Sequence, residues 1–311
     1  MNSKTHSRLR QHHISALAGA LAWLLLLVLW PAAPPTIALI TRLLLLAVLV
    51  LVPLALGLAA NGANRWRLAL RVQPLAAAVT AIAFLLPAGT LAGGLALCLL
   101  LFVGAVALLG LRHLLDHGLR DAAELCIDVS LLLLPIGGFW LAMARFGARP
   151  LGFGDTIVLL TAVHFHYAGF ALLLLTGLAG RRLRSSTPHV WGVFRLVAAG
   201  VIAGVPLVAL GITFSRELEI LAVLLLASSV LALALLTLVA VVPRLARRAA
   251  RVLLAVSALA SVATMLLAVG YVGGSRAGLA LTIPQMVLAH GVVNSFGLVL
   301  CGLLAWTLEL S

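Results

Sequence analysis

The chain consists of long apolar runs, separated by short stretches that contain arginine, proline or glycine. A helix rises about 1.5 Å per residue and the hydrocarbon core is about 30 Å thick, so roughly 20 apolar residues cross it. None of the runs alternates apolar and polar residues as a barrel strand does. The pattern therefore predicts an all-α fold, a bundle of about ten transmembrane helices. They are expected at residues 14–30, 35–60, 73–89, 90–111, 121–145, 155–180, 189–212, 217–242, 250–272 and 281–308.

The composition excludes a soluble fold. Hydrophobic residues make up 64% of the chain and charged residues only 9%, whereas a soluble domain has about 25% charged residues. A surface with so few polar groups must be solvated by lipid, so the lipid bilayer is the predicted partner. The formal charge of +13 does not indicate a nucleic-acid partner, because the basic residues are spread over the short gaps between apolar runs.

The basic residues also predict the topology, because cytoplasmic loops are enriched in lysine and arginine. Fifteen fall on one side of the predicted helices and four on the other, namely Arg145, Arg149, Arg216 and Arg276. This difference places both termini in the cytoplasm. We expect residues 1–13 to form a cytoplasmic tail and residues 14–311 a single transmembrane domain. The first run is expected to be an uncleaved anchor, because residues 30–31 are a poor cleavage context.

Acidic residues at membrane depth need a partner or a task, because burying a charge there is costly. Asp121, Glu124 and Asp128 are spaced so that they share one helix face. Asp128 lies about 10 Å inside the membrane, at nearly the depth predicted for Arg195 on another helix. One interpretation is a buried Asp128–Arg195 ion pair. The other is an acidic wall of a polar cavity, in which a carboxylate acts as a general acid.

Glu217 and Arg42 are predicted near the opposite surface. Glu217 begins a helix, where an acid is common because it opposes the helix dipole. Arg42 lies about 10 Å inside its helix, and it either extends to the surface or pairs with Glu217 or Glu219. In the functional interpretation Glu217 is an alternative to Asp128 as the strong acid, and Glu124 and Arg42 orient the substrate.

The most unusual string is His164-Phe165-His166-Tyr167-Ala168-Gly169-Phe170. His164 is expected about 13 Å below the surface, close to the bilayer centre. His290 is expected at the same depth on the last helix, with Asn294 one turn later on the same face. A single buried histidine is usually a core residue, but several at one depth, with a tyrosine and an asparagine, indicate a shared polar cavity.

A metal site is the alternative interpretation of these histidines. Residues two apart on a regular helix point about 200° away from each other, so His164 and His166 cannot both ligate one ion from such a helix. Local unwinding near Gly169, or a third ligand from Asp128 or Glu217, would make coordination possible. We therefore predict no cofactor, with a divalent metal held by His164 and His290 as the alternative.

The two strings that carry the histidines resemble the YndJ-like family of bacterial polytopic membrane proteins. They are residues 164–170 and the segment Ala289-His290-Gly291 through Asn294-Ser295-Phe296-Gly297. The resemblance implies a multi-pass protein of the bacterial cytoplasmic membrane whose sixth and tenth helices hold the characteristic residues. It implies no particular activity.

The residues favour a membrane-embedded enzyme that performs acid–base chemistry on an apolar, isoprenoid- or polyketide-type substrate. Such a cofactor-independent isomerase, cyclase or hydrolase would use His164, His166 and His290 as acids and bases, and Tyr167 and Asn294 to orient the substrate. Kinks at residues 135–138 and at Pro206 are expected to open space for a ligand. Membrane-embedded cyclases and isomerases of natural-product pathways are an analogy. A proton-coupled transporter, a metal-dependent intramembrane enzyme and a structural protein are the other hypotheses.

Overall fold

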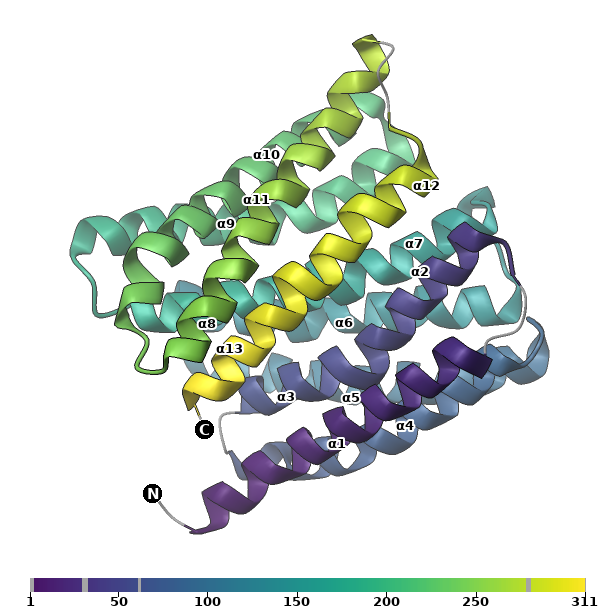
Figure 1. Ribbon diagram of the computed structural model, residues 1–311, viewed down its shortest axis with the longest axis horizontal. Helices are drawn as coiled ribbons and strands as arrows, with labels where there is room; N and C mark the ends of the chain where they lie inside the picture. The colour runs from purple at the N-terminus through teal and green to yellow at the C-terminus, as the bar shows by residue number, and fades with distance from the viewer. Residues whose placement is uncertain (1–2, 30–32, 61–62, 278–280, 311) are drawn as a thin grey trace. The chain divides into compact units, whose positions relative to one another are not determined.

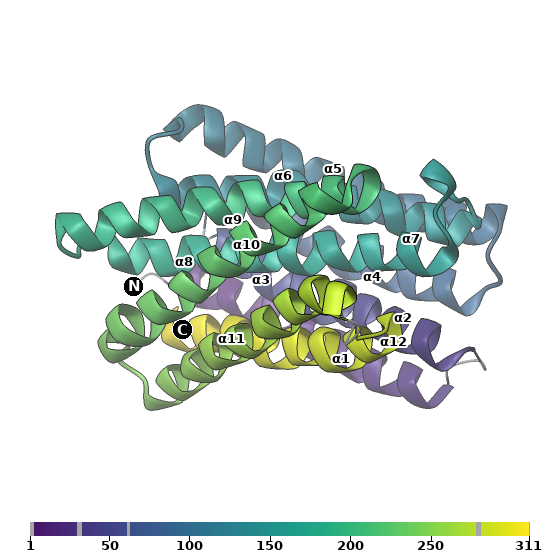
Figure 2. The ribbon, with the colours of Figure 1, turned by 90° about the horizontal axis from the view of Figure 1, so that it is seen from above.

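The computed structural model describes residues 3–29, 33–60, 63–277 and 281–310, and the side chains of 13–28, 33–60, 63–274 and 281–310. Throughout these ranges the regular secondary structure is helical (Figures 1 and 2). Ten helical stretches follow one another, and nine of those described are long and apolar enough to cross a membrane. The tenth is the N-terminal helix, whose apolar part is His13–Val28. The predicted all-α transmembrane fold is confirmed, and the cytoplasmic position of the termini stays a prediction.

The helices end close to the predicted positions. The first half contains α1 (Ser3–Leu29), α2 (Pro35–Leu46), η1 (Ala47–Leu51), α3 (Val52–Ala60), η2 (Asn64–Trp66), α4 (Arg67–Leu85), α5 (Thr90–His117) and α6 (Ala122–Phe146). The second half contains η3 (Pro150–Gly152), α7 (Asp155–His164), η4 (Phe165–Leu172), α8 (Leu173–Leu183), α9 (Pro188–Phe214), α10 (Arg216–Leu236), η5 (Thr237–Val241), η6 (Val242–Arg244), α11 (Arg248–Ala277), α12 (Ile283–Met286), η7 (Val287–Gly291), η8 (Val293–Leu300) and α13 (Cys301–Leu310).

The third predicted helix begins earlier than expected, at Asn64 instead of residue 73. Arg67 and Arg71 lie in its first turns, and both are exposed. Charged residues do not end a helix at this position, because a long arginine side chain extends to the polar interface while its apolar stem follows the helix. The two arginines therefore belong to the helix and not to the loop before it.

Several of the long helices contain π-helical turns. These segments are η1, η4, η5, η7 and η8. A π-turn is rare, and it is found frequently at functional sites because it widens the helix and changes the direction of its side chains. Both histidine strings fall in such segments: His166 and Tyr167 in η4, His290 in η7 and Asn294 in η8.

The described chain forms two compact units. Unit 1 consists of Met1–Asp116 and Ser130–Ala171, and unit 2 of His117–Val129 and Leu172–Ser311. Helix α6 therefore begins in unit 2 and continues in unit 1, while the continuous helix α7–η4–α8 begins in unit 1 and ends in unit 2.

Unit 1 is organised around the helix α2–η1–α3, which is buried along almost all of residues 40–60. Helix α1 packs against η1, α3 and α4, and α2 packs against α7. The approach of α1 to η1 depends on Gly19, because a Cβ atom there would lie 1.9 Å from the Leu49 carbonyl oxygen. No side chain larger than hydrogen fits at this crossing.

Unit 2 is a second set of closely packed helices. Helix α10 packs against α9 and α11, and α11 packs against η8 and α13 (Figures 1 and 2). The contact of α9 with α10 again uses a glycine, since a Cβ atom on Gly211 would lie 2.4 Å from the Cα atom of Glu219. Small residues at helix contacts are typical of membrane proteins, where close packing replaces the hydrophobic effect.

Candidate functional site

His166 is the most deeply buried imidazole among the described side chains, with 2% of its surface exposed. Its Nδ1 atom lies 2.8 Å from the carbonyl oxygen of Ala162, one turn earlier on the same helix. A carbonyl only accepts hydrogen bonds, so Nδ1 carries the proton in this arrangement. The Nε2 atom is buried and has no hydrogen-bond partner in the described part of the chain. The ring therefore presents a buried acceptor nitrogen.

Gly137 provides the space for this ring. A Cβ atom at Gly137 would lie 2.6 Å from Nδ1 of His166 and 3.3 Å from Cβ of Phe165. The sequence predicted a kink at residues 135–138 that would open space for a ligand. Pro135 lies inside helix α6 and Pro206 inside α9, and the kinks stay a prediction. The room beside Gly137 is occupied by the imidazole.

The neighbours of His166 in the string have other contacts. The Tyr167 hydroxyl donates a hydrogen bond of 2.9 Å to the carbonyl oxygen of Leu43, in the last turn of α2. This bond joins two helices of unit 1, so the hydroxyl predicted to orient a substrate is held by the protein. His164 is the last residue of α7, is half-buried, and meets the Phe165 ring edge-on at 5.2 Å between centroids.

His290 lies in unit 2 and has a different environment. Its Nδ1 atom lies 2.9 Å from the carbonyl oxygen of Thr264 on α11, and its Nε2 atom lies 2.9 Å from Nδ2 of Asn294. Nδ1 is the donor to the carbonyl, and Nε2 accepts from the amide. The predicted common face of His290 and Asn294 is therefore confirmed. The Oδ1 atom of Asn294 is buried without a partner among the described atoms.

The predicted histidines are thus divided between the units. His164, His166 and Tyr167 belong to unit 1, and His290 and Asn294 belong to unit 2. The convergence of the two histidine strings on one cavity stays a prediction. Within the described residues, no group of three or more histidine, cysteine, aspartate or glutamate side chains could hold a metal ion. The alternative metal site at His164 and His290 therefore gains no third ligand from this set.

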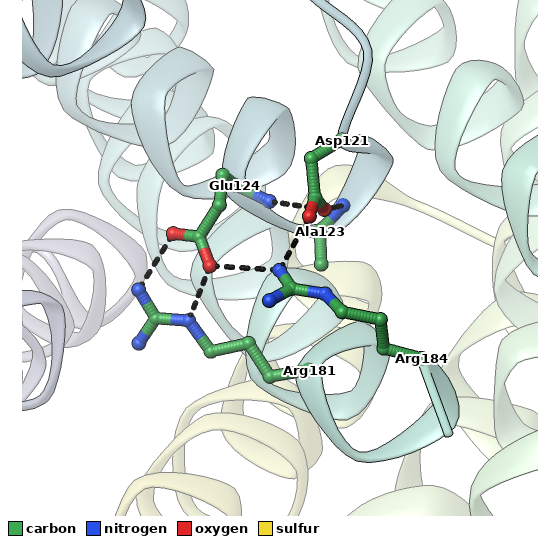
Figure 3. A network of polar contacts seen from close by, with 5 residues as sticks. All are labelled: Asp121, Ala123, Glu124, Arg181 and Arg184. Carbon is green, nitrogen blue, oxygen red and sulfur yellow. Dashed lines mark hydrogen bonds and ion pairs between the residues drawn. The ribbon is translucent and has the colours of Figure 1, made fainter. Parts of the chain in front are cut away.

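The acidic stripe of α6 ends in an ionic cluster within unit 2 (Figure 3). Glu124 accepts two hydrogen bonds from Arg181, of 2.9 Å and 2.7 Å, and one of 2.9 Å from Arg184. Arg184 also pairs with Asp121 at 2.7 Å. Burial lowers the pKa of Arg184, but the hydrogen bond to Glu124 and the two carboxylates raise it above its ordinary value. We call these four residues the ionic clasp.

Two glycines bring α8 close enough to α6 for the clasp to form. A Cβ atom on Gly177 would lie 2.6 Å from the carbonyl oxygen of Ala123, and one on Gly180 would lie 2.8 Å from Cβ of Ala123. Arg181 and Arg184 follow directly on this contact. Both oxygens of Glu124 accept hydrogen bonds from guanidinium groups, and its substrate-orienting role stays a prediction.

Asp128 lies on the same face, one turn further into α6, and is completely buried. The side chain of Arg195 is exposed. The Asp128–Arg195 pair stays a prediction, and the buried Asp128 stays a candidate functional group.

Glu217 is exposed and belongs to the first turn of α10. Its Oε2 atom accepts a hydrogen bond of 2.8 Å from Ser215, whose Oγ atom in turn accepts one from the backbone of Leu218. This is a helix N-terminus closed by side chains. Glu219 beside it pairs with Arg216 at 2.6 Å. Ser215 is the N-cap of α10 and Glu217 accepts from its hydroxyl, and the strong-acid role of Glu217 stays a prediction.

Arg42 lies on α2 in unit 1 and is half-buried. Its carbonyl oxygen accepts a hydrogen bond of 2.8 Å from Nε1 of Trp23 on α1. The residue thus helps to join α1 to α2 through its backbone. Glu217 and Glu219, its predicted partners, belong to unit 2.

A small cavity of about 30 Å³ lies within unit 2. Its walls are mainly leucine and alanine, with Thr237, Ser257, Ser261 and Trp306 as the polar members. This volume holds about one or two water molecules. A substrate of isoprenoid size would therefore need a rearrangement of the helices before it could enter this cavity.

Sequence reasoning missed the partners of the predicted residues. Arg181 and Arg184 were used only as topology signals, although the glycines at 177 and 180 directly before them indicate a close helix contact. The acceptor for His290 could not be found in the same way, because it is the backbone carbonyl of Thr264 and carries no residue-specific signal.

Residues 42–298 match the family model described as YndJ-like protein. This range is most of the chain and includes both histidine strings. The chain belongs to the YndJ-like family. It is 30% identical over 218 residues to the uncharacterized membrane protein YndJ of Bacillus subtilis (strain 168), a match that covers 70% of this chain and 39% of that relative. The comparison with solved structures gives no match. The family and the helices together show a multi-pass membrane protein.

Proposed function

We propose that the protein is a membrane-embedded enzyme that performs acid–base chemistry on an apolar substrate, such as an isomerisation, a cyclisation or the opening of an epoxide. The observation that carries this proposal is His166. The bond from Nδ1 to the Ala162 carbonyl selects the tautomer in which Nε2 is the base, and Nε2 is buried without a partner among the described residues. An imidazole held in this way can take a proton from a substrate.

The surroundings of His166 suit a reaction in which water must be kept away. Phe165 and Phe170 lie in the same segment η4 as His166, and both are buried. Apolar walls of this kind hold a greasy substrate and protect a cationic intermediate from water. The π-turns of η4 supply a widened helix next to the base. His164, at the edge of the same segment, is the second candidate for proton transfer.

Fewer acidic residues are candidates for the general acid than the sequence alone suggests. Glu124 is bound in the ionic clasp and Glu217 accepts a hydrogen bond from the N-cap Ser215 of α10, so we assign neither as the general acid. Asp128 in unit 2 stays the candidate acid, because it is completely buried. His290 has both ring nitrogens engaged, and we assign it to the support of Asn294.

The test is a conversion assay on purified protein in detergent, with apolar lipid extract from Bacillus subtilis as the substrate pool and mass spectrometry as the readout. His166→Asn keeps an N–H donor for the Ala162 carbonyl but removes the base. Loss of a general base lowers a rate by roughly 10²–10⁴-fold, so product should fall at least 100-fold. Thr161→Val is the control, since its hydroxyl only bonds Ile157 in its own helix. Undiminished product with His166→Asn contradicts the assignment.

A proton-coupled transporter is the second candidate. The observation that favours it is the division of the chain into two compact helical units, because alternating access moves one helical bundle against another. Uptake by reconstituted vesicles that an uncoupler abolishes, without any change in the mass spectrum of the lipid extract, would support transport over catalysis.

A further inference from the structure

One end of unit 2 carries a large excess of positive charge. Contacts of Arg182 and the backbone of Ala246 with Glu309, and of Arg244 with Ser186, bring the segments 181–187, 242–248 and 309 together. The clasp adds residues 121 and 124 to this end. Its acids are Asp121, Glu124 and Glu309, and its arginines are Arg120, Arg181, Arg182, Arg184, Arg244, Arg247, Arg248 and Arg251.

The carboxylates at this end are already bound by the protein. Asp121 and Glu124 pair with the arginines of the clasp. Glu309 has a side chain that is only 3% exposed, and it accepts hydrogen bonds from Arg182 and from the backbone nitrogens of Ala246 and Arg247. None of the three acids is in an ion pair with the arginines between 244 and 251, within the side chains that the structure describes.

Those four arginines, at 244, 247, 248 and 251, form what we call the basic corner. All four are exposed. Arg244 donates to the Ser186 hydroxyl at 2.5 Å, and Arg251 donates to the Ala246 carbonyl at 3.5 Å, so both recorded acceptors are neutral. The backbone beneath is fixed, because Leu245 and Ala250 are buried. The charges are therefore held together on an ordered base.

The opposite end of unit 2 shows that this excess is not a general property of its loops. It carries Glu217 and Glu219 beside Arg216 and Arg276, so its formal charges balance. The side chain of Arg276 lies outside the described residues. At that end Arg216 pairs with Glu219, whereas the basic corner has no such partner in the described set.

We propose that the basic corner binds the phosphate headgroup of an anionic phospholipid such as phosphatidylglycerol. Arg248 begins a membrane-spanning helix and Arg244 ends the one before it, so the guanidinium groups lie at the level where lipid phosphates lie. Guanidinium groups bind phosphate oxygens in pairs, and clusters of basic residues next to a transmembrane helix attract anionic lipid. This site is independent of the proposed chemistry at His166.

The experiment compares lipid binding by the full chain, purified in a neutral detergent. Dioleoyl phosphatidylglycerol, dioleoyl phosphatidylcholine or sodium phosphate is added, and native mass spectrometry measures the bound lipid. We expect phosphatidylglycerol to bind with preference over phosphatidylcholine. In the triple variant Arg247→Gln, Arg248→Gln and Arg251→Gln its affinity should fall by at least about tenfold, since three of the four guanidinium groups that attract the anionic headgroup are removed.

The matched control removes the same charge from unit 1, with Arg67→Gln, Arg71→Gln and Arg112→Gln, all exposed positions. This variant should keep most of the affinity for phosphatidylglycerol. Equal losses in both triple variants would show a diffuse effect of net charge and overturn the proposal. Equal binding of the two lipids, or displacement of phosphatidylglycerol by millimolar sodium phosphate, would overturn it as well.

Discussion

His166 in unit 1 and His290 in unit 2 look alike in the sequence and differ in the structure. Each lies in a π-helical segment, and each places Nδ1 within 3 Å of a backbone carbonyl oxygen, at 2.8 Å and 2.9 Å. The carbonyl bound by His166 belongs to its own helix, whereas that bound by His290 belongs to α11. Nε2 of His290 accepts a hydrogen bond from Asn294, whereas Nε2 of His166 has no partner among the described residues.

This difference separates a supporting histidine from a reactive one. A buried ring with both nitrogens hydrogen-bonded links its neighbours, and its hydrogen bonds replace those that it made to water. A ring with one buried nitrogen unpartnered is destabilising for the fold, because the lost hydration of that nitrogen is not replaced. Such a group is expected where function requires it. We therefore propose His166 in unit 1 as the base and a packing role for His290.

The same substitution should destabilise the protein much more at His290 than at His166. His290→Leu leaves Nδ2 of Asn294 without an acceptor and removes the bond to α11, so we expect a loss of about 2–3 kcal/mol. His166→Leu removes a buried nitrogen that has no partner and should cost less than about 1 kcal/mol. Unfolding in detergent, followed by circular dichroism, measures both. Equal losses would remove the distinction between the two histidines.

The contact of the His166 ring with Gly137 on α6 can be tested by a substitution at Gly137. Gly137→Ala places a methyl group 2.6 Å from Nδ1, so the ring must move and the bond to Ala162 must weaken. We expect a loss of about 1–3 kcal/mol, as for other overpacked sites, together with a loss of turnover. Gly94→Ala is the control, because a Cβ atom there meets nothing within 4 Å. A stable Gly137→Ala protein would show that the ring is not fixed by α6.

The helices could be predicted because lipid imposes a simple rule on the sequence. Proline and glycine mark the turns and the apolar runs mark the spans, so residues 155–180 and 189–212 were placed within a few residues of α7–α8 and α9. The π-turns could not be predicted, since Phe165–Leu172 has the same apolar character as the regular helix α9. Widened turns depend on packing between helices, which periodicity does not record.

The candidate site was predictable in its residue types but not in its partners. His290 and Asn294 were placed on one face, because i and i+4 neighbours on a helix follow from geometry alone. The partner of Glu124 was missed, since pairing with Arg181 requires the crossing of α6 and α8 at Gly177. The acceptors of His166, Tyr167 and His290 are all backbone carbonyls, and these are present at every residue of the sequence.

The support of His290 by Asn294 gives a smaller expected effect. Asn294→Leu removes the donor to Nε2 and also the unpartnered Oδ1 atom, so the loss and the gain partly cancel. We expect a net destabilisation of about 1 kcal/mol, measured by the same unfolding experiment. If His290 only supports the fold, the Asn294→Leu protein that remains folded should keep its turnover. A large loss of turnover in a stably folded Asn294→Leu protein would give this pair a direct part in the reaction.

The smallest expected effect belongs to Tyr167, next to His166 in the string. Tyr167→Phe keeps the ring but loses the hydrogen bond of 2.9 Å to the Leu43 carbonyl. Hydrogen bonds between membrane helices contribute about 0.6 kcal/mol on average, and the Leu43 carbonyl keeps its bond from the backbone of Ala47. We therefore expect a loss of about 0.6 kcal/mol and unchanged turnover. If turnover instead falls 100-fold without loss of stability, the hydroxyl leaves Leu43 during the reaction and contacts the substrate, and the reactive group of unit 1 is then the pair His166–Tyr167.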